Sequence, residues 1–256
     1  MKKIATKIYY FLFDILMLKK GVNISINGFQ MRMPVRYYKY YQDGYEKDNF
    51  EFYKAEIKED NTILDIGGHI GLNAVLFARL AHKGKVYVFE PAPNTFNIIN
   101  DTVRINKLQD RVTVTQQAVS NNSGSTFFYM ADSNLADNAN SLIHHRLDKK
   151  LKKIEVQLTT IDEFIAANNI KKVDFIKMDV EGAELDALKG GIGCLKTYKP
   201  KMTLGLHPTP IKQKGDSLEE IYDLLVDCKY VIKLDNKILD RQAFCGYTVL
   251  FDVQLT

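Results

Sequence analysis

The fold of this chain is decided by the stretch Thr62-Ile-Leu-Asp-Ile-Gly-Gly-His-Ile-Gly-Leu-Asn-Ala74. A short apolar run, interrupted by Asp65, leads into Gly67, Gly68 and Gly71, and apolar residues resume after the last glycine. This order predicts a buried strand, a glycine turn and a helix. Such a turn brings backbone N–H groups at the start of a helix close to a ligand. Many α/β proteins bind a nucleotide-like molecule there.

The acid in this turn indicates what kind of ligand to expect. Asp65 precedes Gly67 in the spacing Asp-x-Gly-Gly-x-x-Gly, whereas Gly-x-Gly-x-x-Gly would favour a dinucleotide. A carboxylate inside the turn suits a ligand with a cationic end, and S-adenosylmethionine carries both an ammonium and a sulfonium. A glycine-rich turn without a ligand is the alternative interpretation.

The composition excludes several classes of protein. The chain has 256 residues, enough for one large α/β domain or two small ones. Its 35 basic and 31 acidic residues leave a net charge of +4, which does not indicate a nucleic-acid-binding protein with a concentrated basic stripe. The three cysteines are an odd number without metal-ligand spacing. We therefore expect a cytoplasmic protein, no nucleic-acid partner and no bound metal.

An apolar segment near the N-terminus, residues 8–18, is flanked by lysines and interrupted by Asp14. It is shorter than the roughly 20 residues that a membrane-spanning helix needs, and no small-residue cleavage site follows it. A helix packed on the domain is the first interpretation. A helix resting on an anionic membrane surface, a peripheral membrane contact, is the second.

Residues 1–60 read as a lead-in to the main domain. An alternating pattern around Asn27-Gly28 predicts a hairpin, and a tyrosine-rich segment and a short helix follow it. We expect these residues to pack on a single domain formed by residues 61–256, with the tyrosines used for packing ahead of ligand binding. A long polar loop at 131–153 is typical of a lid or a substrate-selecting segment.

After the glycine turn, strands and helices alternate. Glu90 ends the second strand about 20 residues past the turn, where an acid can accept two hydrogen bonds from a ribose diol. The pattern predicts an α/β fold with a doubly wound, mostly parallel seven-stranded sheet. Its predicted strands after the first are 85–89, 111–115, 173–179, 201–206, 231–234 and 247–253.

Three acids and one histidine stand at later strand ends. Asp179, Glu181 and Glu184 follow the strand that neighbours the glycine-turn strand in a doubly wound sheet. His207 ends the next strand, and a histidine with an ordinary pKa near 6.5 can take a proton from a hydroxyl at neutral pH. A structural histidine and acids that stabilise a helix N-terminus are the alternatives.

The order of these motifs resembles the FkbM family of class I S-adenosylmethionine-dependent methyltransferases. The resemblance covers roughly residues 60–210 and implies a Rossmann-like fold. It rests on residues 64–71, 89–91 and 118–120 and, most specifically, on Ile176-Lys-Met-Asp-Val-Glu-Gly-Ala-Glu184. His69 stands where the family often has a small amide residue.

The resemblance implies which residues contact the cofactor S-adenosylmethionine. The glycine-turn residues would hold its methionine end, Glu90 the ribose and Ala118 the adenine edge, with Asp179 beside the sulfonium. The full set of implied contacts is Asp65, Gly67, Gly68, His69, Gly71, Glu90, Ala118 and Asp179.

The family resemblance further implies methylation of a hydroxyl, for instance on a sugar, a glycan, a glycolipid or another small molecule. We predict His207 as the general base, with Asp179 or Glu181 as the competitor. Two other functions share parts of the pattern. An NAD-dependent oxidoreductase would also use the glycine turn and Glu90, and a non-catalytic relative would bind an adenosyl ligand or a partner protein.

Overall fold

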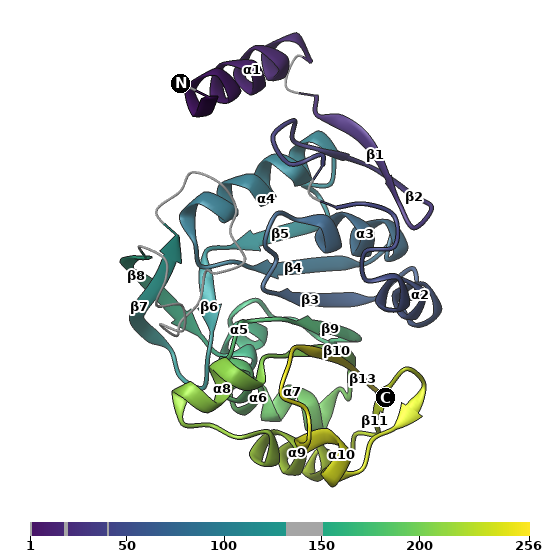
Figure 1. Ribbon diagram of the computed structural model, residues 1–256. Coiled ribbons are helices and arrows are strands. Elements are labelled where there is room, and N and C mark those ends of the chain that lie inside the picture. The colour runs from purple at the N-terminus through teal and green to yellow at the C-terminus, as the bar shows by residue number, and fades with distance from the viewer. Residues whose placement is uncertain (1, 18–19, 40, 132–150) are drawn as a thin grey trace.

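A central sheet of eight strands, the middle layer in Figure 1, organises the computed structural model, which describes residues 2–17, 20–39, 41–131 and 151–256. The strand order is β12-β11-β13-β10-β9-β3-β4-β5. The strands are β3 (Thr62–Ile66), β4 (Lys85–Phe89), β5 (Val112–Thr115), β9 (Phe175–Met178), β10 (Lys201–Leu206), β11 (Ile232–Leu234), β12 (Lys237–Ile238) and β13 (Phe251–Leu255).

The strand directions confirm the predicted doubly wound sheet. The five strands from β5 to β10 are parallel, and β13 lies antiparallel between β10 and β11. The chain reverses its order at β3, because β4 and β5 extend the sheet to one side and β9 and β10 to the other. A ligand site is expected at such a reversal, outside the carboxyl ends of the strands.

Helices cover both faces of the sheet, because successive strand side chains point to opposite faces. Ile63 and Phe175 pack into one core, and Leu64 and Ile176 into the other. The first core is covered by α2 (Lys47–Glu56), α3 (Leu72–Leu80) and α4 (Pro93–Ile105). The second is covered by α5 (Ile161–Ala167), α6 (Glu184–Lys189), α7 (Ile192–Thr197), α8 (Pro208–Lys214), α9 (Leu218–Asp227) and α10 (Arg241–Cys245).

The N-terminal lead-in contributes side chains to the first core. It consists of α1 (Lys2–Leu16), a hairpin of β1 (Val22–Ile26) and β2 (Phe29–Met33), and α2. Met31 and Met33 of the hairpin and Phe50 and Tyr53 of α2 are buried there. Among the described residues, no helix combines the length and apolar character that crossing a membrane requires.

A smaller sheet of three strands follows β5 in the chain. Its order is β6-β8-β7, with bounds Gln117–Val119 for β6, Gly124–Ala131 for β7 and Leu151–Thr159 for β8. The loop predicted at 131–153 is therefore strand at both of its ends, and the part between, residues 132–150, lies outside the described residues.

A close backbone contact separates α6 from α7. Gly190 lies against the backbone of Ser120, and the chain turns there. A Cβ at Gly190 would lie 2.0 Å from the Ser120 carbonyl oxygen, so this close approach requires glycine. Between β11 and β13 the chain forms β12 and α10.

We predict that Phe175→Ala destabilises the fold strongly. The Phe175 ring is fully buried on β9, with the rings of Phe52, Tyr53 and Phe77 centred 5.8–6.0 Å away. Removing it leaves a cavity between the lead-in and the sheet and should cost about 3–5 kcal/mol in urea unfolding. Ile238→Ala, at a side chain 71% exposed, is the matched control and should change stability by less than about 0.5 kcal/mol. Equal losses in the two variants would contradict this description of the core.

Candidate functional site

The glycine turn folds over the end of β4 and against the end of β9. Gly67 and Gly68 both donate their backbone N–H groups to the Phe89 carbonyl oxygen, at 3.0 and 3.1 Å. Gly67 has φ +87°, and a Cβ there would lie 1.9 Å from the Asp179 carbonyl oxygen. The turn therefore requires glycine on conformational and on steric grounds. Gly71, also at positive φ, precedes α3 and ends the turn.

A pocket open to solvent lies in front of this turn. It is bounded by the turn, by the ends of β4, β6 and β9, and by the tyrosine-rich lead-in. The polar, glycine and aromatic residues that line it include Tyr41, Tyr45, Glu46, Gly67, Gly68, His69, Asn73, Glu90, Thr95, Gln117, Phe128, Lys177, Asp179 and Glu181, and Ala118 lies among the apolar ones. Three predicted site residues, Asp65, Gly71 and His207, are not among the lining residues.

Three hydrogen bonds hold the Glu90 carboxylate at the pocket wall. The backbone N–H of His69 donates to Oε2 at 3.0 Å, and the N–H of Ala92 and the hydroxyl of Thr95 donate to Oε1 at 3.1 and 2.7 Å. Burial raises the Glu90 pKa to about 7, although these donors lower it. Oε1 accepts two of these hydrogen bonds and Oε2 accepts one, so Oε2 can still accept a hydrogen bond from a ligand hydroxyl.

His69 connects the glycine turn to the lead-in. Its backbone has φ +50°, a left-handed conformation that His adopts more readily than most residues. Its ring Nδ1 lies 2.9 Å from the Tyr41 hydroxyl oxygen, while its N–H holds Glu90. His69 thus keeps a tyrosine of the lead-in beside the pocket.

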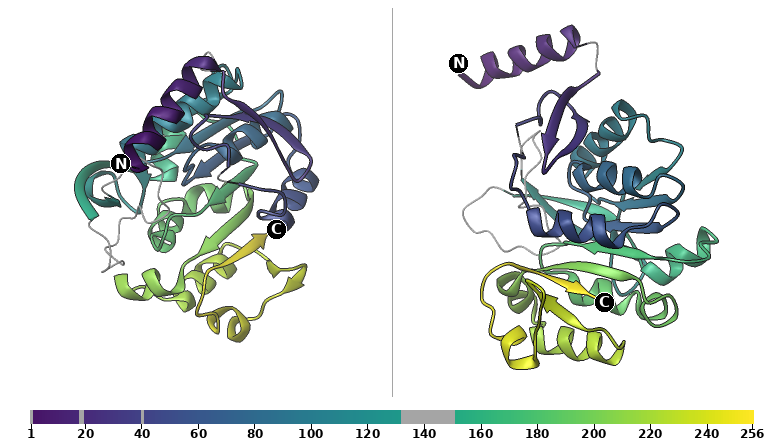
Figure 2. Two further views of the ribbon diagram at one scale, coloured as in Figure 1. Left: turned by 45° about the horizontal axis from the view of Figure 1, so that its top comes forward. Right: turned by 90° about the vertical axis from the view of Figure 1, so that its right-hand side faces the viewer.

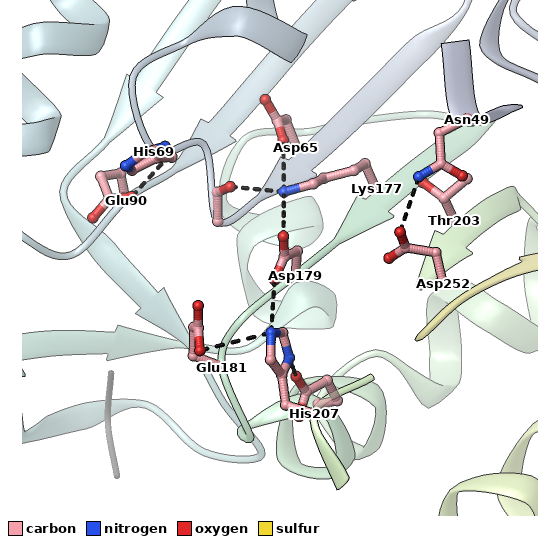
Figure 3. A network of polar contacts seen from close by, with 12 residues as sticks. Asn49, Asp65, His69, Glu90, Lys177, Asp179, Glu181, Thr203, His207 and Asp252 are labelled. Atoms are coloured by element: carbon pink, nitrogen blue, oxygen red, sulfur yellow. Dashed lines mark hydrogen bonds and ion pairs between the residues drawn. The ribbon is translucent and has the colours of Figure 1, made fainter. Parts of the chain in front are cut away.

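Lys177 lies at the centre of a polar cluster behind the turn (Figure 3). Its ammonium donates to the Gly67 carbonyl oxygen at 2.8 Å and lies 3.7 Å from Asp179 Oδ2 and 4.0 Å from Asp65 Oδ1. Burial lowers the Lys177 pKa, but the charges of Asp179, Asp65 and Glu46 raise it by more. The net shift is upward, so the side chain stays charged. The sequence reasoning missed Lys177, although it stands inside the Lys-x-Asp string used for the family resemblance.

Asp65 lies behind the turn instead of on the pocket surface. It is fully buried, faces Lys177 across the β3–β9 pair, and accepts no hydrogen bond from any described residue. Burial raises its pKa to about 6, Lys177 lowers it and Asp179 raises it. A direct contact between Asp65 and a cofactor remains a prediction.

His207 sits among three carboxylates, below Asp179 in Figure 3. Its Nδ1 lies 2.7 Å from Glu184 Oε1, and its Nε2 lies 3.6 Å from Asp179 Oδ1 and from Glu181 Oε2. Burial lowers the His207 pKa, but the hydrogen bond and charge of Glu184 and the charges of Asp179 and Glu181 raise it to about 9. His207 is therefore protonated at neutral pH.

The role of His207 as general base remains a prediction, and its surroundings favour the protonated ring. An imidazolium has no lone pair to accept a hydroxyl proton, and the ring is outside the pocket lining. Asp179 and Glu181, the predicted competitors, do line the pocket. His207 therefore lies between these two acids at Nε2 and Glu184 at Nδ1.

Two aromatic residues and one acid of the lead-in also line the pocket. The rings of Tyr41 and Tyr45 have centroids 4.4 Å apart, and Glu46 follows directly. Burial raises the pKa of Tyr45 and of Glu46. The sequence reasoning ranked these tyrosines as packing residues, and the signal that could have found them is their density just before the glycine turn.

We predict that His207→Gln makes stability less dependent on alkaline pH. The folded-state His207 pKa of about 9 exceeds the ordinary 6.5, so its ion pairs stabilise the fold fully below pH 6.5 and lose that effect as pH rises through 9. The variant should be destabilised by up to about 3 kcal/mol at pH 6 and much less at pH 10, measured by urea unfolding. A loss of equal size at both pH values would show that the ring acts by packing alone.

Comparison with known proteins identifies the family. A family model described as the methyltransferase FkbM domain matches residues 65–232, more than half of the chain. The hexuronic acid methyltransferase AglP of Haloferax volcanii is 28% identical over 152 residues, covering 59% of this chain and 59% of the relative. The 2-O-methyltransferase NoeI of Sinorhizobium fredii is 26% identical over 145 residues, covering 52% and 58%. The chain thus matches somewhat less than two thirds of the length of these relatives.

A solved structure shows the same fold. Methyltransferase FkbM from Methylobacillus flagellatus matches with a TM-score of 0.52 at 19% sequence identity, over 78% of this chain and 44% of that one. At this identity the similarity is one of fold, and it agrees with the strand order described above. Together with the family model, it shows that this chain belongs to the FkbM methyltransferase family.

Proposed function

We propose that this protein is an S-adenosylmethionine-dependent O-methyltransferase whose acceptor is a hydroxyl of a sugar, glycan or glycolipid. The observation that carries the proposal is the position of Glu90. Its carboxylate is held by three donors at the wall of a pocket that also contains the glycine turn and two further acids.

The residues of the pocket fit this cofactor. Glu90 is oriented to accept hydrogen bonds from a ribose diol, and Gln117 and Ala118 at β6 line the side where the adenine would lie. Asp65 is buried without a hydrogen-bond donor among the described residues, and Asp179 lines the pocket close by. These two carboxylates suit the ammonium and sulfonium groups at the methionine end of S-adenosylmethionine. When bound, S-adenosylmethionine supplies an electrophilic methyl group.

We infer that Asp179 or Glu181 removes the proton of the acceptor hydroxyl. The acceptor oxygen must approach the methyl carbon in line with the bond that breaks, and the hydroxyl proton must leave. Both carboxylates line the pocket, and the His207 imidazolium lies 3.6 Å from each of them. We infer that His207 keeps the two acids in place and that the nearer one receives the proton, with orientation supplying much of the rate.

The lining of the outer pocket favours a neutral sugar over an anionic one. Aromatic rings such as Tyr41 and Tyr45 can cover the apolar face of a sugar ring, and carboxylates accept hydrogen bonds from its hydroxyls. Of the described lining residues, four are acidic (Glu46, Glu90, Asp179 and Glu181), and Lys177 is the one lysine or arginine. The relative AglP is named for hexuronic acid, whereas the acids here would repel a free carboxylate on the acceptor.

We place this reaction in the cytoplasm on the basis of the cysteines. Cys194 and Cys228 are buried free thiols on the second core, and Cys245 is free as well. Unpaired thiols are typical of a reducing compartment. The proposal agrees with an acceptor made or assembled inside the cell.

We predict that Glu90→Gln weakens binding of S-adenosylhomocysteine at least about tenfold in calorimetric titration, because charged hydrogen bonds to the ribose hydroxyls are lost. Glu59→Gln is the matched control: it is a half-exposed acid whose surface ion pair with Lys83 should have little influence. Binding of NAD without S-adenosylhomocysteine would instead support an oxidoreductase. Binding of S-adenosylhomocysteine without turnover on any acceptor would support a non-catalytic relative.

We predict that Asp179→Asn lowers the turnover number about 100-fold or more, because a general base typically contributes that factor. Cofactor affinity is measured separately, because Asp179 also lies on the side expected for the sulfonium. Formation of S-adenosylhomocysteine is measured with neutral glycans and with matched uronic acid glycans, and mass analysis locates the methyl group. Glu181→Gln is measured in parallel to distinguish the two acids. Unchanged turnover in both variants would remove the proposed route for the proton.

A further inference from the structure

Helix α1 exposes a large apolar face. The exposed fractions of Ile8, Phe11, Leu12, Ile15 and Leu16 lie between 48% and 76%. At 3.6 residues per turn, these positions form one continuous stripe along the helix. Folded proteins rarely leave such a stripe uncovered unless it contacts a partner or a membrane.

The position of α1 keeps this stripe away from the cores. Figures 1 and 2 show the helix at one end of the molecule, beyond the β1–β2 hairpin, with the other helices gathered around the sheet. No described residue of α1 belongs to any of the hydrophobic cores. The five apolar side chains named above are therefore exposed and lie outside these cores.

The net charge of the protein is concentrated in this segment. Residues 1–20 contain five lysines (Lys2, Lys3, Lys7, Lys19 and Lys20) and one acid (Asp14). The whole chain has 35 basic and 31 acidic residues, so the rest of the chain carries 30 of each. The +4 charge of the protein is thus the charge of its N-terminal helix and the residues that follow it directly.

We propose that α1 lies on the surface of an anionic phospholipid bilayer, with its apolar stripe in the interface and its lysines near the lipid headgroups. A lysine close to an anionic membrane contributes about 1 kcal/mol, and the buried apolar side chains add to this. The helix of 15 residues is too short to span the bilayer, which agrees with a position parallel to the surface.

Charge favours the bilayer over a second copy of the chain as the occupant of this surface. Pairing two α1 helices would bring six lysines together with only two acids, and like charges repel. An anionic surface instead neutralises them. The helix also leads directly into the hairpin and then to Tyr41 and Tyr45 at the pocket, so the bound segment and the pocket rim are close in the chain. The inference itself does not depend on methyl transfer.

The test is co-sedimentation of the full-length protein with vesicles of phosphatidylcholine alone and of phosphatidylcholine mixed equally with phosphatidylglycerol. We expect binding to the mixed vesicles to be at least about tenfold tighter and to weaken at high salt. The double variant Phe11→Glu/Leu16→Glu should lose at least about tenfold in binding to the mixed vesicles. Ile238→Glu/Val249→Glu, at side chains 71% and 69% exposed elsewhere, is the matched control and should bind like the wild type.

A second variant separates charge from folding. Lys2→Gln/Lys3→Gln/Lys7→Gln should lose its preference for the anionic vesicles while its thermal unfolding stays unchanged. The inference is overturned if the wild type does not sediment with either vesicle, or if all variants bind equally. It is also overturned if light scattering shows a dimer that Phe11→Glu/Leu16→Glu dissociates, without vesicle binding by the wild type.

Discussion

The buried ammonium of Lys177 is the interaction on which the rest of the site depends. It is directly opposite Asp65 on β3 and Thr203 on β10, so a row of polar side chains crosses the centre of a sheet face that is otherwise apolar. Lys177 also holds the Gly67 carbonyl oxygen at 2.8 Å, which fixes the glycine turn from behind. A buried charge costs free energy unless it is paired, and here two carboxylates and a carbonyl oxygen supply the pairing. One side chain therefore contacts both the glycine turn and an acid of the pocket wall.

A second ionic group sits at the neighbouring strand end. His207 and Glu184 form a buried pair behind Asp179 and Glu181, so the two acids face the pocket on one side and a cation on the other. Asp179 lies between the two clusters, near Lys177 and near His207. A change at either cation should therefore reach the same carboxylate.

Much of the fold was predictable because it follows from local pattern. An apolar run followed by the glycine turn predicted β3, and apolar runs predicted β4, β9 and β10. The place of Glu90 followed from its distance along the chain after the glycine turn. The protonation of His207 was not predictable, because it depends on Glu184 at the start of α6 and on Asp179 after β9, which only the folded chain brings together. The same holds for Asp65, whose place behind the turn depends on which face of β3 it occupies. The left-handed backbone of His69 explains how histidine can stand where the family often has a small amide residue, since both residue types tolerate this conformation.

We propose that the pocket in front of the Lys177-supported turn holds S-adenosylmethionine. A crystal structure of the complex with S-adenosylhomocysteine tests this most directly. We predict that both ribose hydroxyls lie within hydrogen-bond distance of Glu90, that the sulfur lies on the side of Asp179, and that Lys177 keeps its bond to the Gly67 carbonyl oxygen. A nucleoside bound away from Glu90, or a turn that releases Lys177 to contact the ligand, would contradict it.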